Sequence, residues 1–206
     1  MPKGSVELTN ARREEIISAC AKLYESMSFK DITIKEIGAV TSFTRTSIYN
    51  YFETKEEIFL ALLQKEYEWW VNDLNEIVAA HKEMSVDDTA SVLARSLAKR
   101  ERLLKLLSMN HYDMEQNSRP ERLVEMKRAY GEALNAVTRL LQVLRPQMSE
   151  AERENFIYIF FPFMFGAYPY AVVTQKQRDA MREAEVEYSY YSLYEILENC
   201  IKTLLR

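Results

Sequence analysis

The sequence predicts an all-α protein in which a small N-terminal helical domain precedes a larger helical one. Apolar residues recur at steps of three and four along most of the 206 residues, which is the spacing of one helix face. The chain contains only four glycines and five prolines, and it shows no run of alternating β-branched residues that would indicate a strand. We therefore expect about nine helices.

The composition favours an intracellular protein. Cys20 and Cys200 lie near opposite ends and match no metal or redox spacing, so we expect reduced thiols in a cytoplasmic protein. The first ten residues contain no apolar run of signal-peptide length. The formal net charge is -4, but residues 1–53 carry seven Lys and Arg against seven Asp and Glu. The acidic excess therefore lies outside this first segment.

Apolar stripes predict the first helix and one long helix. The first could be capped by Thr9 or Asn10, and its stripe consists of Ile16, Cys20, Leu23 and Met27. The long helix runs from Thr54 to His81, with Leu63, Tyr67, Trp70, Leu74 and Ile77 on one face. At ~1.5 Å per residue it is about 42 Å long. Such a rod can connect two sites.

Capping patterns predict where other helices begin. Thr33 to Glu36 matches a capping box, in which the hydroxyl accepts from the third helical N–H and the glutamate from the N–H of the cap. Thr44 can cap a further short helix that ends near Tyr49. Thr54 to Glu57 and Ser149 to Glu152 repeat the box pattern. The remaining helices are expected at 86–99 behind Ser85, 102–115, 120–144 behind Ser118, and 188–205, with a charged, solvated connection at 176–187.

Two short helices joined by a tight connection form a helix-turn-helix. The later helix would present side chains able to reach base edges or phosphates in a major groove, namely Arg45, Thr46, Ser47, Tyr49 and Asn50. The same pattern also fits a compact helical packing module whose tyrosines are half-buried. Residue types alone leave both interpretations open.

The run IGAVTSFTRTSIYNYF, residues 37–52, followed by KEEI at 55–58, resembles the DNA-binding domain of TetR-type transcriptional regulators. The resemblance covers about fifty residues without a gap. Thr41 and Ser42 replace the usual Ala-Gly of the turn, and Thr46 replaces a glycine near the start of the recognition helix. Ser42 must then adopt the backbone geometry that a glycine would ease.

The resemblance implies a helix-turn-helix DNA-binding domain at residues 1–53 and an effector-binding and dimerisation domain at 54–206. By position in the motif, the residues expected at DNA bases or phosphates are Thr33, Thr44, Arg45, Thr46, Tyr49, Asn50, Tyr51 and Lys55. Ile37, Ile48 and Phe52 are expected to pack between the helices. The resemblance further implies a palindromic DNA operator. Most members of the family repress transcription, so the resemblance also implies a repressor.

Residues 155–175 carry no charge and are long enough for a membrane span. Pro162, Gly166 and Pro169 interrupt this segment, and tyrosines occur through its body, so we expect burial inside protein and no membrane association. In TetR-type proteins the last two long helices pair with a second chain. The resemblance therefore implies a homodimer whose interface includes Phe156, Phe163, Tyr170, Tyr190, Leu193, Leu197, Ile201 and Leu204.

The resemblance also implies a ligand cavity. We hypothesise that a small-molecule effector of unknown identity, bound among the later helices, tilts the long helix and lowers DNA affinity. Aromatic and thioether side chains of the later helices suit an apolar or aromatic effector. The candidate pocket residues are Trp69, Met109, Tyr112, Tyr130, Phe160, Met164 and Tyr168. Each of them can instead be plain core.

One pair of side chains has the spacing of a partial metal site. His111 and Glu115 lie at helical spacing i and i+4, which could supply half of a metal site. Only one other histidine, His81, exists, so we expect no metal, no cofactor and no catalytic residue. Two alternatives remain open: the same fold with a protein partner in place of a small effector, and an all-α enzyme using His111 and nearby acids.

Overall fold

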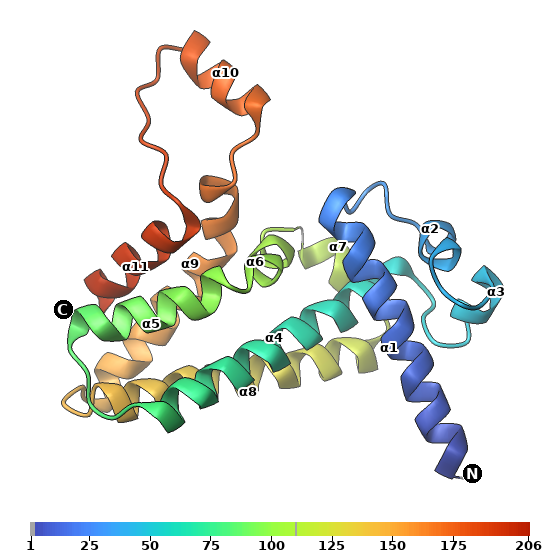
Figure 1. Ribbon diagram of the computed structural model, residues 1–206, viewed down its shortest axis with the longest axis horizontal. Helices are drawn as coiled ribbons and strands as arrows, with labels where there is room; N and C mark the ends of the chain where they lie inside the picture. The colour runs from blue at the N-terminus through green and yellow to red at the C-terminus, as the bar shows by residue number, and fades with distance from the viewer. Residues whose placement is uncertain (1–2, 110) are drawn as a thin grey trace. The chain divides into compact units, whose positions relative to one another are not determined.

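The computed structural model describes residues 3–109 and 111–206, with side chains for 6–109 and 114–206. The described residues form eleven helices and no strand (Figure 1). The helices are α1 Lys3–Ser26, α2 Ile34–Ala39, α3 Arg45–Ile48, α4 Lys55–Ala80, α5 Val86–Ala98, α6 Glu101–Leu107, α7 His111–Gln116, α8 Pro120–Leu144, α9 Glu150–Ala171, α10 Gln175–Glu183 and α11 Leu193–Leu204. The all-α prediction is confirmed.

The chain divides into two compact units. Unit 1 comprises residues 1–65 and 110–129, and unit 2 comprises 66–109 and 130–206. Both α4 and α8 contribute residues to each unit. These compact units do not coincide with the expected domains 1–53 and 54–206, and the functional division at residue 53 stays a prediction.

Two predicted caps lie at the wrong residues. Thr9 and Asn10 are inside α1, which begins at Lys3, because no proline follows Pro2 in this stretch and the helix continues past them. Ser118 does not cap α8: its buried hydroxyl has no hydrogen-bond partner, and the carbonyl of Arg119 instead accepts from the next turn. The predicted caps Ser85 and Ser149 are confirmed, the latter in a complete capping box with Glu152.

Two predicted segments are divided differently in the structure. The helix expected at 102–115 is two helices, α6 and α7, because the carbonyls of Leu104 and Leu106 accept from Ser108 and Met109 in a closing turn. The stretch 176–187 is largely the exposed helix α10. The last helix begins at Leu193 and not at residue 188, because Ser192 forms a capping box with Glu195.

The core of unit 1 lies between α1, α2, α3 and the start of α4. Ile16, Ile37, Ile48 and Phe52 are fully buried there, and Tyr24 and Phe29 contact the ring of Phe59 edge-on. The expectation that Ile37, Ile48 and Phe52 pack between helices is confirmed. The opposite sides of these short helices are thereby left to solvent.

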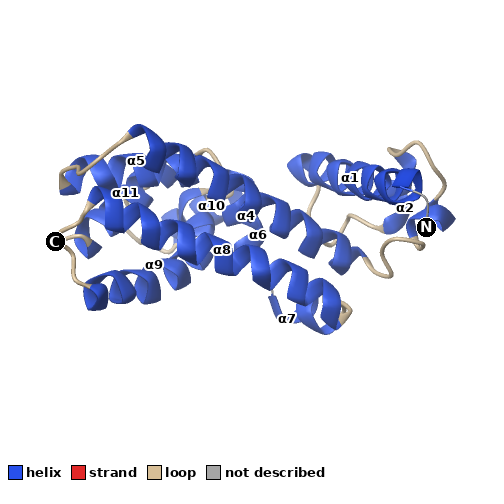
Figure 2. Ribbon diagram, turned by 90° about the horizontal axis from the view of Figure 1, so that it is seen from below, coloured by secondary structure: helices blue, strands red, loops and turns tan. Residues whose placement is uncertain are grey.

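An aromatic cluster forms much of the core of unit 2. Its members are Tyr67, Trp70, Tyr130, Phe156, Phe160 and Phe161, and the ring centroids of neighbouring members lie 5.1–6.1 Å apart. Helix α11 packs against α5 and α9 in this unit (Figures 1 and 2). The Tyr194 hydroxyl lies 3.1 Å from that of Ser91, and Lys202 pairs with Asp87 at 3.4 Å.

Helix α9 is buried on one side only. Phe156, Phe160 and Met164 are fully buried, whereas Tyr158 is 80% exposed and Tyr170 62% exposed. Among the described residues no single helix has the length and hydropathy of a membrane span. Only α9 and α10 taken together reach that threshold, and they are bent by 81°.

Candidate nucleic-acid interface

The start of α2 is fixed by Thr33. Its backbone is extended, with φ -123° and ψ 166°, and its hydroxyl oxygen accepts from the N–H groups of Lys35 at 3.2 Å and Glu36 at 3.5 Å. The Glu36 carboxylate accepts from the Thr33 hydroxyl, and not from the N–H of Thr33 as the capping box predicts. Thr33 and Lys35 are exposed. The N-terminal end of α2 is therefore open to a ligand.

Gly38 allows α2 and α3 to approach closely. A Cβ added at Gly38 would lie 3.3 Å from the Cα and 3.4 Å from the backbone N of Arg45. Both neighbours are main-chain atoms at the start of α3, so a side chain at position 38 would displace that helix. The glycine thus sets the spacing of the two helices.

The turn between α2 and α3 is held by side chains. The Thr41 hydroxyl donates to the carbonyl of Gly38 or of Phe43, each at 3.1 Å. Ser42 donates from its N–H and its hydroxyl to the carboxylate of Glu15 on α1. The only described residue with a positive φ that is not glycine is Glu185, so Ser42 does not adopt a glycine-like conformation. That expectation is wrong, because the contact with Glu15 fixes the turn in an ordinary backbone geometry.

Helix α3 presents a polar outer side. Thr44, Arg45, Thr46, Tyr49 and Asn50 are exposed, Tyr49 by 45%. The guanidinium of Arg45 donates to the Tyr49 hydroxyl at 3.3 Å and lies 6.0 Å from the centre of its ring. The guanidinium and the phenol are therefore brought together. Tyr51 is half-buried, with its ring 6.4 Å from that of Phe43.

Lys55 is placed differently from the other predicted DNA contacts. Its ammonium group donates to the carbonyls of Phe29 at 2.7 Å and Ile32 at 3.1 Å, and it lies 4.3 Å from the centre of the Phe29 ring. These contacts join α4 to the loop after α1. A phosphate contact would compete with them.

Arg119 fixes the start of α4, a role that no local sequence pattern indicates. Its guanidinium donates to the Glu57 carboxylate at 2.7 and 2.8 Å, and its backbone N–H donates at 3.1 Å. The same guanidinium lies 3.3 Å from Glu53 and 3.5 Å from the carbonyl of Tyr51. Burial alone would raise the pKa of Glu57, but Arg119 and two backbone N–H groups hold it below its usual value. The segment after α3 is thus fixed to the loop before α8.

The predicted effector-pocket residues differ in burial, and their common role stays a prediction. Phe160 and Met164 are fully buried, Met109, Tyr130 and Tyr168 are half-buried, and Trp69 is 37% exposed. Burial raises the pKa of the phenols of Tyr130 and Tyr168, and Glu101 raises that of Tyr168 further. The side chains of His111 and Tyr112 lie outside the described residues.

Trp69 lies among cations on the surface of unit 2. The guanidinium groups of Arg100 and Arg102 lie 5.9 and 5.8 Å from its ring. Arg100 also pairs with Asp73 at 2.6 Å, and Arg102 pairs with the buried Glu66 at 2.6 Å. A hollow of about 360 Å³ opens nearby between α4 and α5, lined by residues that include Asp73, Ile77, Arg95 and Lys99. None of the predicted pocket residues lines it.

The predicted dimer residues divide into two groups. Phe156, Leu197 and Ile201 are fully buried within one chain, so a second chain cannot contact these side chains without rearrangement. Helical periodicity marked them as apolar but could not tell which neighbour covers them. Phe163, Leu193 and Leu204 are half-buried, and Tyr170 and Tyr190 are exposed.

Comparison with known proteins matches two family models to almost the whole chain. The model for "Bacterial regulatory proteins, tetR family" matches residues 16–62, and that for "Tetracyclin repressor-like, C-terminal domain" matches residues 64–206. A search of curated protein sequences found no match.

Several solved structures share the fold at low sequence identity. The Thermus thermophilus repressor FadR, solved with lauroyl-CoA, is 22% identical over 94% of this chain and 93% of its own, with a TM-score of 0.60. FadR from Bacillus subtilis, solved with stearoyl-CoA, is 14% identical over 93% and 97%, with a TM-score of 0.59. SmeT, the repressor of a Stenotrophomonas maltophilia multidrug efflux pump, is 19% identical over 96% and 90%, with a TM-score of 0.53.

The helix-turn-helix of unit 1 and the matched family models define a DNA-binding transcriptional regulator. The chain belongs to the TetR family.

Proposed function

We propose that this protein is a ligand-responsive repressor that binds a palindromic operator as a homodimer and is released by a small effector. The observation that carries the DNA-binding part is the exposed side of α3. Arg45, Thr46 and Tyr49 face solvent while Ile48 of the same helix is fully buried. A guanidinium can read guanine in the major groove, and hydroxyl and phenol groups can fix the register on phosphates.

The uncovered side of α9 supports the homodimer. Tyr158, Pro162, Gly166 and Tyr170 follow one another at steps of four, and all are exposed. Among the residues that the structure describes, a Cβ added at Gly166 would have no neighbour within 4 Å, so none of them requires a glycine there. A glycine inside a helix costs stability, and it becomes useful where another backbone approaches closely. A dimer would place two recognition helices about one DNA turn apart, ~34 Å.

The core of unit 2 supports an apolar or aromatic effector. The aromatic cluster, with Tyr130 only half-buried, offers flat apolar surface in the interior, and the cations around Trp69 could attract an anionic head group. Long-chain acyl-CoA molecules are the first compounds to test, because they combine an apolar tail with phosphates. Two structures of the same fold contain such molecules.

Coupling between effector and DNA would run through α4 and the Glu57–Arg119 pair. Helix α4 continues without a break from Lys55 to Ala80. Its first turn is fixed to the loop before α8, close in sequence to α3. An effector that shifts α4 or α8 would therefore move the segment after the recognition helix. A coupling free energy of ~1–3 kcal/mol is typical of such systems.

Selection from a random pool of DNA duplexes, at near-physiological salt, tests the operator proposal. We expect a palindrome whose half-sites are about one helical turn, ~34 Å, apart. Arg45→Ala, at an exposed position, should reduce enrichment without unfolding the protein. Failure of the folded protein to enrich any sequence at any salt concentration would refute operator binding.

Thermal shift and operator release test the effector proposal. Lauroyl-CoA and stearoyl-CoA should raise the melting temperature and dissociate the operator complex, and free coenzyme A should do neither. Flat aromatic compounds form a second arm of the panel. If no compound of either class changes the melting temperature of the folded dimer, the small-effector proposal is refuted and the interpretation with a protein partner is the one to test next.

A further inference from the structure

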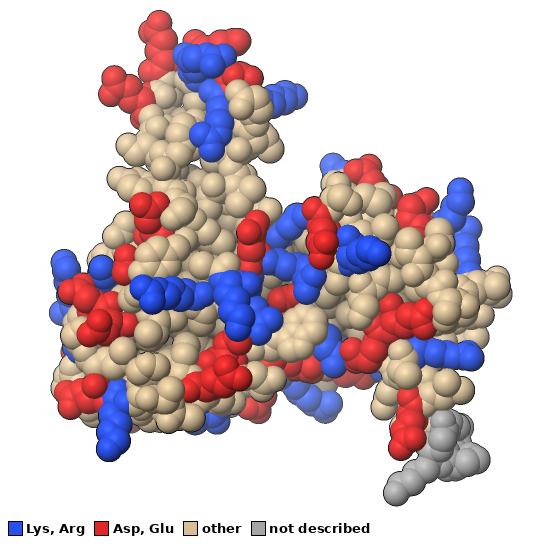
Figure 3. Space-filling model, viewed as in Figure 1, with Lys and Arg blue, Asp and Glu red and all other residues tan. Residues whose placement is uncertain are grey.

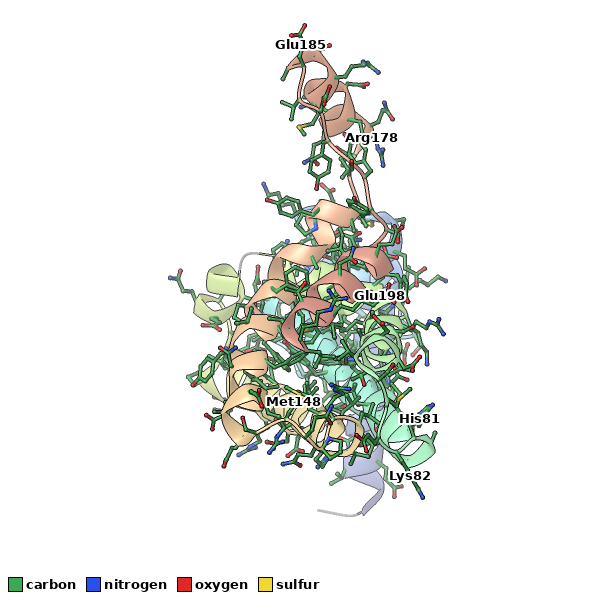
Figure 4. The ribbon with its side chains drawn as sticks, turned by 90° about the vertical axis from the view of Figure 1, so that its left-hand side faces the viewer. His81, Lys82, Met148, Arg178, Glu185 and Glu198 are labelled. Carbon is green, nitrogen blue, oxygen red and sulfur yellow. The ribbon has the colours of Figure 1, made fainter. Side chains whose placement is uncertain are left out.

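Residues 172–191 form a projecting segment, which we call the arm. It consists of α10 and its two connections, and it extends from the end of α9 away from the rest of unit 2 (Figures 1 and 4, where Arg178 and Glu185 are labelled on it). No residue of α10 is buried. Residues of the arm itself make the hydrogen bonds at both ends of α10. Thr174 caps its start, and after its end the N–H of Val186 donates to the carbonyl of Met181 at 3.0 Å.

The arm and the end of α9 enclose a hollow of about 330 Å³. Its lining consists of Pro169, Tyr170, Val173, Gln177, Met181, Tyr188 and Tyr190. The guanidinium of Arg178 lies 4.2 Å from the centre of the Tyr190 ring, and the rings of Tyr188 and Tyr190 are 5.1 Å apart. No lining residue is charged, and in Figure 3 the charged side chains of the arm gather at its far end. The hollow therefore suits an aromatic group.

The volume of the hollow is that of a small site. Pockets for small molecules begin at about 300 Å³, so a hollow of about 330 Å³ accommodates an aromatic side chain and is also large enough for a small free molecule. Tyrosine rings and a thioether are favourable neighbours for another aromatic ring. The amide of Gln177 in the wall offers a polar partner for a phenol hydroxyl.

Tyr158, on α9, is an aromatic side chain that no other part of the described structure covers. It is 80% exposed and lies twelve residues before Tyr170, about 18 Å at ~1.5 Å per residue. Pro162 and Gly166 lie between them on the same exposed side. Position 164, the midpoint of Tyr158 and Tyr170, is also the midpoint of Pro162 and Gly166. The exposed side of α9 is thus symmetric about one point, with small residues near the centre and tyrosines at both ends.

We propose that Tyr158 docks into the arm hollow of a second copy of this chain. If two α9 helices cross antiparallel at Pro162 and Gly166, a two-fold axis brings Tyr158 of each copy to the Tyr170 end of the other. A two-fold axis forms every contact twice, so both hollows are filled. The inference rests on the proposed homodimer and adds a specific contact to it. The occupant is a second copy because the spacing of these residues matches the symmetry of such a pair.

Disulfide trapping between two different variants tests this contact. One copy carries Tyr158→Cys and the other carries Gln177→Cys. Both variants also carry Cys200→Ser, which removes a half-buried thiol. Burial raises the pKa of that thiol to about 11, so it is already a poor nucleophile at neutral pH. We expect a cross-link only in the mixture of the two variants. A matched pair with Gln142→Cys, exposed on α8, in place of Gln177→Cys should give no cross-link.

Sedimentation and hydrogen exchange give an independent measurement. Tyr158→Ala, at a highly exposed position, should leave each chain folded but weaken the dimer by roughly tenfold and speed exchange in residues 174–191, whereas Tyr158→Phe should restore most of the affinity. A Tyr158→Ala dimer of unchanged affinity, without the cross-link, overturns the docking and leaves the homodimer standing. A wild-type chain that stays monomeric at all concentrations overturns the homodimer itself. Binding of an aromatic dye in the hollow of the intact dimer shows that the hollow is empty and also overturns the docking.

Discussion

The carboxylate of Glu57 accepts three hydrogen bonds from Arg119, although 62 residues separate them in sequence. Glu57 is buried at the start of α4, and Arg119 lies just before α8. The same region carries a second contact, from the Thr54 hydroxyl to the carbonyl of Asn117 at 2.8 Å. The segment that follows the recognition helix is therefore fixed by a loop remote in sequence. This arrangement leads to the first prediction.

We predict that Arg119→Ala lowers the free energy of unfolding by about 2–4 kcal/mol, because it leaves the Glu57 carboxylate buried without its cation. Urea titration at neutral pH measures the change. Glu53→Gln is the matched control, since Glu53 contacts the same guanidinium from an exposed position and should change stability little. Equal stability of Arg119→Ala and wild type would show that the Glu57–Arg119 pair is not structural.

The same pair predicts a pH dependence. The folded state lowers the pKa of Glu57 below its ordinary value of about 4.5, so its contribution is fully present above that pH. It is lost as the pH falls through the folded-state value. We expect the stability difference between wild type and Glu57→Gln to shrink below pH ~4.5. Urea midpoints at pH 7, 4.5 and 3 check this, and a difference that grows toward pH 3 would contradict the assignment.

Arg45→Ala should weaken operator binding by roughly 1–3 kcal/mol and relax preference at one base pair, if Arg45 reads a guanine. Its contact with the Tyr49 hydroxyl suggests that Tyr49→Phe will affect affinity as well, through loss of the partner that orients the guanidinium. Fluorescence anisotropy with operator and scrambled duplexes separates the two effects. If Arg45→Ala leaves operator affinity and base preference unchanged, Arg45 does not read the operator sequence.

Lys55 offers a clear choice between two roles. A phosphate contact predicts that Lys55→Ala weakens binding to all sequences alike and reduces the salt slope by about one. The contacts of its ammonium with Phe29 and Ile32 predict a lower melting temperature with the salt slope preserved. We expect the second outcome. Salt titration of DNA binding, together with thermal denaturation of the free protein, distinguishes the two outcomes. Lys35→Ala, at an exposed position on α2, is the control for removing a lysine charge from the surface of unit 1.

Two helix-interior glycines allow a matched test of the α9 surface. A Cβ at Gly131 in α8 or at Gly166 in α9 has no neighbour within 4 Å in the described part of the chain. Substitution by alanine should therefore stabilise either helix by about 0.5–1 kcal/mol. If a second chain approaches α9 at Gly166, a bulkier Gly166→Leu should weaken the dimer while Gly131→Leu leaves it intact. Sedimentation velocity over a concentration series decides, and equal dimer affinities in both leucine variants would count against a crossing at Gly166.

The sequence by itself determined the helices that local chemistry controls. The period of apolar residues located α4, α5 and α8, and serine caps fixed the starts of α5 and α9, because these signals act within one or two helical turns. The motif in residues 37–58 was sufficient to indicate the TetR family, which the comparisons establish. It also separated the buried face of α3, Ile48, from the exposed Arg45 and Tyr49.

Only the tertiary structure decided which partner each side chain has. Lys55 has the charge of a phosphate ligand, but its ammonium lies against carbonyls from a preceding loop. Phe156 and Tyr158 belong to one apolar run, yet one is fully buried and the other 80% exposed. Arg119 bears no local mark of its pairing with Glu57. Such contacts join residues far apart along the chain, and their free energy depends on burial and geometry that periodicity and composition do not contain.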